Sequence, residues 1–153
     1  FKMILLKTGS WVLVADGQKA LFLRNDLNTK DYDLRVVWHQ ETENPPSKYQ
    51  GSDRAGRASS VPGMRRGALQ ETDWHQLSED HYVKEVAAIL DRAAHDGAFD
   101  EIVVVAPPKV LGDLRAEISP DTMKKVVAEI PKTLTNHPIE KIESLLKSEL
   151  EQM

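Results

Sequence analysis

The stretch Ile102-Val103-Val104-Val105-Ala106-Pro107-Pro108 decides the fold of this chain. Four β-branched residues in a row are typical of a short strand, and the proline pair ends it because proline lacks a backbone N–H donor. An unbroken apolar run has no polar face to turn toward water. We therefore predict a central strand of a sheet that carries helices on both faces.

Helical patterns flank this strand. Before it, apolar residues recur at helical spacing from Val83 to Ala94, with Ser78 as the expected N-cap and Gly97 as the stop. Beyond it we expect, in order, a short helix over 109–118, a helical turn opened by Ser119 and Pro120, a strand over 126–130 and an amphipathic helix from Pro138. The segment 126–130 is also compatible with a helix.

The N-terminal part of the chain predicts an antiparallel meander. The apolar run Trp11–Ala15 and the alternating run Lys19–Leu23 are joined through Asp16-Gly17, a hairpin signal. A third strand follows over 34–39, and we expect both Trp11 and Trp38 in the core. The order is then β-β-β-α-β-α-β-α, which is that of an α/β, ribonuclease H-like mixed sheet.

Length and composition set limits on the class of protein. The chain has 153 residues, 41% hydrophobic and 29% charged, with a formal net charge of −4 and no cysteine. We expect one domain over 1–153, and we exclude a disordered chain, a uniformly basic nucleic-acid binder and disulfide or thiol chemistry. No apolar run approaches the roughly 20 residues that span a bilayer, so we expect no membrane span and a cytoplasmic location.

The regular pattern stops between residues 44 and 75, where we predict a flexible basic loop between the third strand and the first long helix. Five basic residues lie in it: Lys48, Arg54, Arg57, Arg65 and Arg66. With Asp53 they give residues 48–67 a net charge of +4, so the rest of the chain carries −8. Because guanidinium forks suit phosphate oxygens, this segregation predicts contact with RNA. A solvated loop whose arginines only keep it soluble is the alternative.

Carboxylates at Asp16, Glu79 and Asp80 suggest a metal-dependent nuclease only weakly. Two-metal chemistry needs several carboxylates around cations about 4 Å apart, and the strand before Pro107 ends without a further ligand. The Asp-Gly turn explains Asp16, and the dipole of the expected helix start explains Glu79 and Asp80. We predict no catalytic residue, metal or cofactor, and keep a nuclease or RNA-ester hydrolase as an alternative.

Three segments carry a resemblance to a known family: Trp11–Leu23, Ala106–Arg115 and Val126–Pro138. They resemble the bacterial host attachment proteins, described as required for attachment to host cells. That family is similar to the middle domain of archaeal and eukaryotic peptide-chain release factors and of Pelota. The resemblance implies a ribonuclease H-like fold and a translation-related role with RNA or the ribosome as partner.

The release-factor loop carries Gly-Gly-Gln, and this chain departs from it. The corresponding residues are Arg65-Arg66-Gly67-Ala68-Leu69-Gln70, so the resemblance does not imply peptidyl-tRNA hydrolysis. It implies a non-catalytic domain in which Gln70 joins the five basic residues as an RNA contact. A protein-interaction module that affects attachment to host cells is a further alternative.

Overall fold

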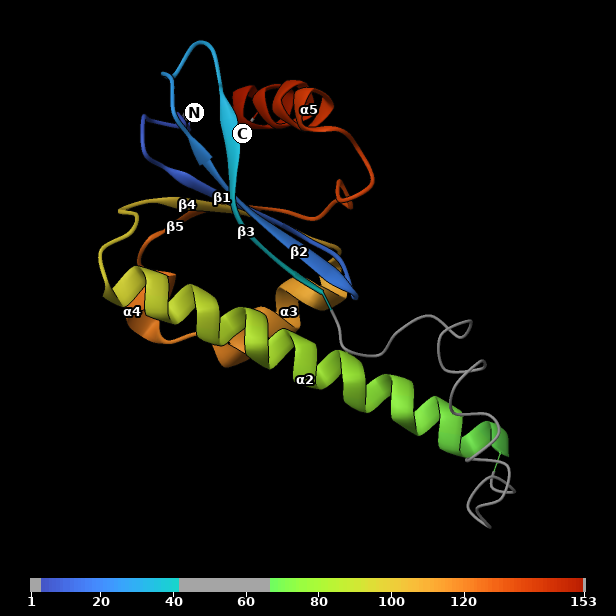
Figure 1. Cartoon of the computed structure of the whole chain (residues 1–153). Helices are drawn as coiled ribbons and strands as arrows, with labels where there is room; N and C mark the ends of the chain where they lie inside the picture. The colour runs from blue at the N-terminus through green and yellow to red at the C-terminus, as the bar shows by residue number, and fades with distance from the viewer. Residues whose placement is uncertain (1–3, 42–66, 153) are drawn as a thin grey trace.

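The computed structural model describes residues 4–41 and 67–152, with side chains of the long helix described from Asp80 onward. It shows a five-stranded mixed sheet in the order β3-β2-β1-β4-β5 with helices on both faces (Figure 1), which confirms the mixed α/β class. The strands are β1 (Trp11–Ala15), β2 (Lys19–Asn25), β3 (Leu34–Glu41), β4 (Ile102–Val105) and β5 (Val126–Ile130). The helices are α2 (Gly67–His95), α3 (Pro108–Glu117), α4 (Pro120–Met123) and α5 (Ile139–Glu151).

Strand β1 is the centre of the sheet. It pairs antiparallel with β2 through the predicted Asp-Gly hairpin and parallel with β4, so Leu13 lies between Phe22 and Val104. Strand β5 continues the parallel part beside β4, and the helical alternative for that segment is wrong. The meander β1-β2-β3 and the parallel strands β4 and β5 therefore share one sheet.

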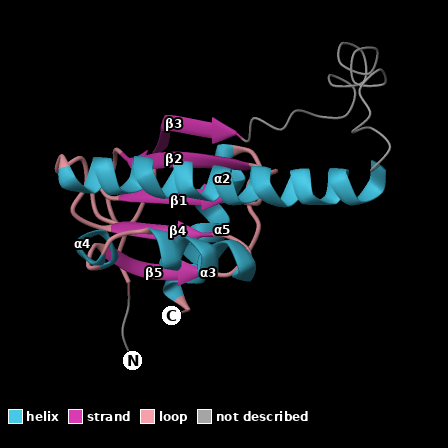
Figure 2. Cartoon of the chain, turned by 90° about the horizontal axis from the view of Figure 1, so that it is seen from below, coloured by secondary structure: helices cyan, strands magenta, loops and turns pink. Residues whose placement is uncertain are grey.

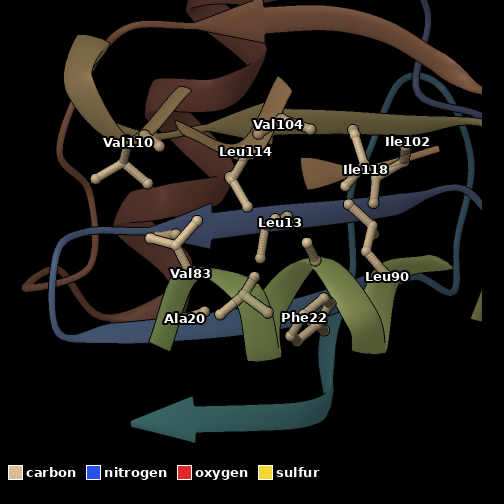
Figure 3. Close-up of a cluster of buried hydrophobic side chains, with 14 of the residues drawn as sticks. Leu13, Ala20, Phe22, Val83, Leu90, Ile102, Val104, Val110, Leu114 and Ile118 are labelled. Carbon is tan, nitrogen blue, oxygen red and sulfur yellow. The ribbon is translucent and has the colours of Figure 1, made fainter. Parts of the chain in front are cut away.

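The two faces of the sheet are buried in separate cores. Leu13, Phe22 and Val104 pack with side chains of α2 and α3 on one face (Figure 3). Val12 and Val14 point to the other face, where α5 covers them. Every residue of β4 is buried, which confirms the central strand that its unbroken apolar run predicts.

The long helix α2 begins at Gly67, so the prediction that it starts at Ser78 is wrong. Residues 67–75 of the predicted loop are helical, and residues 44–66 lie outside the described part of the chain. The stretch after Gly67 lacks the apolar stripe that marks a buried helix, but Ala, Leu, Gln and Glu are strong helix formers. No glycine or proline interrupts the chain before Gly97, so each added residue extends an existing helix by one hydrogen bond.

The structure confirms one side-chain prediction, the cap at Ser119, and contradicts another, the burial of Trp38. Ser119 caps α4 as predicted, with its Oγ accepting from the Thr122 N–H at 3.3 Å. Trp38 was expected in the core, and that prediction is wrong because it is 52% exposed. It lies on β3, which forms the edge of the described sheet and pairs only with β2 there.

Candidate functional site

The carboxyl ends of β1, β4 and β5 meet at one edge of the sheet because these strands run parallel. Ligands of open α/β sheets bind outside this edge. Asp16 follows β1 there, and Thr135 follows β5. The Thr135 hydroxyl donates a hydrogen bond of 2.5 Å to Asp16 Oδ2, so segments far apart in the sequence are tied together at this edge.

Both carboxylate oxygens of Asp16 have protein donors. Oδ1 accepts from the backbone N–H groups of Gln18 at 2.7 Å and Lys19 at 2.8 Å, and Oδ2 accepts from Thr135. The Asp-Gly turn therefore explains this residue, as expected from the sequence. No group of three or more histidine and carboxylate side chains in the described ranges 4–41 and 80–152 could hold a metal ion.

The dipole explanation for Glu79 and Asp80 is wrong, because both residues lie in the interior of α2 rather than in its first turn. Their negative charge therefore has no role at a helix start. The side chain of Asp80, which the structure describes, belongs to no metal-binding group among the described residues.

Tyr82 of α2 carries a buried hydroxyl group that could take part in binding or chemistry. It is fully buried, and its hydroxyl has no hydrogen-bond partner among the described residues. Burial raises the pKa of Tyr82, and the negative charges of Asp16 and Glu41 raise it further. The phenol therefore stays protonated and able to donate a hydrogen bond at neutral pH.

A chain of hydrogen bonds joins the edge strand β3 to α2. The indole Nε1 of Trp38 donates to Gln40 Oε1 at 3.3 Å, and Gln40 Nε2 donates to Glu85 Oε1 at 3.2 Å. The other oxygen of Glu85 lies 3.3 Å from His81 Nε2. These bonds connect the indole to Glu85 and His81 in the middle of α2.

The structure describes little of the predicted RNA contact. The five basic residues lie outside the described residues, so their contacts stay a prediction. Gln70 lies in the first turn of α2 and not in a loop, and the structure describes only its backbone. The six predicted site residues are therefore not brought together by any described feature.

The N-terminal part of α2 extends past the carboxyl edge of the sheet (Figure 2). Gly67 precedes Tyr82, the first buried residue of the helix with a described side chain, by fifteen positions. At 1.5 Å per residue this separates the two by about 22 Å along the helix axis. Gly67 directly follows Arg66, so α2 connects the sheet to the C-terminal end of the basic stretch.

A comparison with known protein families identifies the family to which the chain belongs. The sequence model of bacterial archaeo-eukaryotic release factor family 12 matches residues 9–146. The chain therefore belongs to that family, which confirms the resemblance to release factors. No curated protein matches the chain in sequence. None of the described helices is long and apolar enough to cross a membrane.

Sequence reasoning missed three features of the structure: the bond of Thr135, the exposure of Trp38 and the unpartnered hydroxyl of Tyr82. Thr135 lies in a segment that carries the family resemblance, but nothing in its spacing indicates a bond to Asp16. The exposure of Trp38 had an available signal, because the last strand of a meander before a long connection often lies at a sheet edge. The unpartnered hydroxyl of Tyr82 had no sequence signal, because helical spacing places it on the buried stripe.

Proposed function

We propose that this protein is a non-catalytic, translation-related domain that contacts RNA or the ribosome through the five basic residues between β3 and α2, with Gln70 beside them. The observation that carries the proposal is the separation of charge. Residues 48–67 sum to +4 while the rest of the chain sums to −8. Such a molecule attracts a phosphate backbone at one site and repels it elsewhere.

The architecture agrees with this function. The strand order β3-β2-β1-β4-β5, with β1 antiparallel to β2 and parallel to β4, supports a ribonuclease H-like domain. The position of the basic stretch, between β3 and the long helix, corresponds to that of the release-factor loop. Membership in a release-factor family supports a role in translation.

The absence of Gly-Gly-Gln from the sequence supports binding without peptidyl-tRNA hydrolysis. The hydrogen bonds on both oxygens of Asp16 disfavour the metal-dependent nuclease alternative. An RNA or ribosome partner would agree with the cytoplasmic location expected from the sequence. On this proposal, an effect on attachment to host cells is an indirect consequence of altered translation.

The test replaces Arg54, Arg57, Arg65 and Arg66 with glutamine and measures binding of single-stranded RNA over a range of salt concentrations. Each lost phosphate contact makes the slope of log K against log salt less negative by about 0.7, so four lost contacts change it by about 3. We expect weaker binding at low salt and a much flatter salt dependence.

The control variant replaces Lys7, Lys30, Lys124 and Lys141 with glutamine. These four lysines are exposed on the acidic part of the chain, so the variant has the same net charge as the arginine variant. We expect it to keep most of the affinity and the slope. Equal losses in both variants would mean that only net charge matters, and unchanged binding in the arginine variant would refute the proposed contact.

A further inference from the structure

We infer that Trp38 is a nucleobase-stacking residue, which binds an unpaired base of single-stranded RNA at the open edge of the sheet. This inference rests on the proposed function and names a second part of the same contact. Trp38 is 52% exposed, whereas Trp11 on β1 is 9% exposed. A large aromatic side chain that is half exposed on a strand offers a flat apolar surface, and successive bases stack on such surfaces in single-strand binders.

The indole is held in place rather than free to rotate in solvent. Its Nε1 donates to Gln40, and Gln40 is fixed in turn by its bond to Glu85 of α2. Trp38 also lies directly opposite Phe22 in the β2–β3 pairing, so its side chain is on the face of the sheet that α2 covers. Because the ring is ordered before binding, stacking loses little conformational entropy.

Trp38 lies ten positions before Lys48, the first basic residue of the proposed contact, in the sequence. Strand β3 ends at Glu41, three residues or about 10 Å beyond Trp38, and the chain continues from there toward Lys48. Figure 2 shows that α2 runs over the middle of the sheet and leaves β3 at the open edge. The ring therefore lies on the strand that leads, in the sequence, into the basic residues of the proposed function.

A base suits this site better than a phosphate does. The carboxylates Glu41 and Glu85 lie on the neighbouring parts of β3 and α2, and they repel a phosphate group. A nucleobase is uncharged, and its stacking on an indole depends on the contact of two flat rings. In this proposal the basic residues bind the phosphates of the RNA, and Trp38 stacks on one of its bases.

A base also suits the site better than an added protein strand. The pairing of β2 with β3 shifts register between Phe22 and Leu23, a bulge-like irregularity that disrupts the ladder near Val37. Val36, opposite Leu23, and Trp38, opposite Phe22, consequently lie on different faces of the sheet. Bulges of this kind and charged residues such as Arg35 are features that discourage pairing at an edge strand.

The experiment measures binding of a labelled oligouridylate of about 12 nucleotides to the full chain and to Trp38→Ala, Trp38→Phe and Val36→Ala. Stacking of one base is worth about 1–3 kcal/mol, so Trp38→Ala should weaken binding by about 5- to 150-fold. Trp38→Phe should keep most of the affinity because it retains an aromatic face. Val36 is 48% exposed on the other face of the same strand, and its replacement should change nothing.

Each outcome separates this inference from the proposed function. If the wild type binds with the arginine-dependent salt slope but Trp38→Ala binds equally well, the stacking inference is wrong and the proposed function stands. If the wild type does not bind RNA, both are wrong. If Trp38→Ala and Val36→Ala weaken RNA binding equally, the loss does not depend on the aromatic ring and the stacking inference is overturned. If either variant changes the oligomeric state, the edge binds a protein strand and the inference is overturned as well.

Discussion

The central strand β1 and the edge strand β3 belong to the same sheet but differ in burial and in length. All five residues of β1 are buried, with α2 and α3 on one face and α5 on the other. Strand β3 is longer, and only Leu34 at its start is buried. The difference shows that the position of a strand in the sheet decides whether its apolar side chains are buried or exposed.

The two tryptophans of the sheet make this difference concrete. Trp11 on β1 packs against Phe99 with ring centroids 5.0 Å apart and against Phe22 at 6.2 Å in an edge-to-face arrangement. Trp38 on β3 pairs across the strand with the same Phe22 and yet is half exposed. The same residue type therefore supports the core in one strand and is available for binding in the other.

The largest effect should come from truncating β1. Leu13 is fully buried between Phe22 and Val104, so Leu13→Ala should lower the free energy of unfolding by about 2–5 kcal/mol through lost burial and the cavity that remains. Val36→Ala on β3 should change it by less than about 0.5 kcal/mol. Urea unfolding of both variants measures the contrast, and similar losses would show that β3 is buried in solution.

A smaller effect should come from the turn that leads into β3. Asn25 is fully buried, and its side chain donates to the carbonyls of Leu6 and Asn28 and accepts from the N–H groups of Leu27 and Asp33. Asn25→Ala leaves these backbone groups without their partner, which should cost about 1–3 kcal/mol.

Asn28→Ala is the matched control in the same turn. Its carboxamide accepts from the N–H groups of Lys30 and Asp31, but the site is exposed and water can replace the lost bonds. Urea unfolding should show a clearly smaller loss for Asn28→Ala than for Asn25→Ala. Equal losses would indicate that burial does not set the importance of these bonds.

The smallest effect at neutral pH should come from Tyr82→Phe. The buried hydroxyl has no partner in the described structure, so its removal should leave stability unchanged or slightly higher. The pKa of Tyr82 is raised in the folded state by burial and by Asp16 and Glu41, whereas an unfolded tyrosine ionises near pH 10. Above about pH 10 the unfolded state therefore loses a proton that the folded state keeps.

This difference in pKa means that stability should be fully present below about pH 10 and fall above it, by at most about 1.4 kcal/mol per pH unit from this group. Tyr82→Phe should make that decline shallower in urea unfolding at pH 8 and pH 10.5. Tyr32→Phe is the control, because burial raises the pKa of Tyr32 as well but its side chain is partly exposed. A decline of equal steepness in Tyr82→Phe and wild type would contradict the assignment.

The elements with a complete local pattern could be predicted from the sequence. The apolar run of β4, the Asp-Gly turn after β1 and the Ser119 cap of α4 are each fixed by residues within a few positions of one another. The beginning of α2 could not be predicted in this way. Its first turns lie beyond the sheet, so they carry no apolar stripe that would distinguish a helix from a polar loop.

For the candidate site, the sequence by itself determined which chemistry is available: five cations in one stretch, an opposite charge on the rest of the chain, and no Gly-Gly-Gln. Charge and composition are properties of the residues and need no folding to be known. Only the tertiary structure decided that Thr135 meets Asp16, that Gln40 joins Trp38 to α2, and that Trp38 is exposed while Trp11 is buried. Those facts depend on which strand lies at the edge and which helix covers it, and these are set by pairings between residues far apart in the chain.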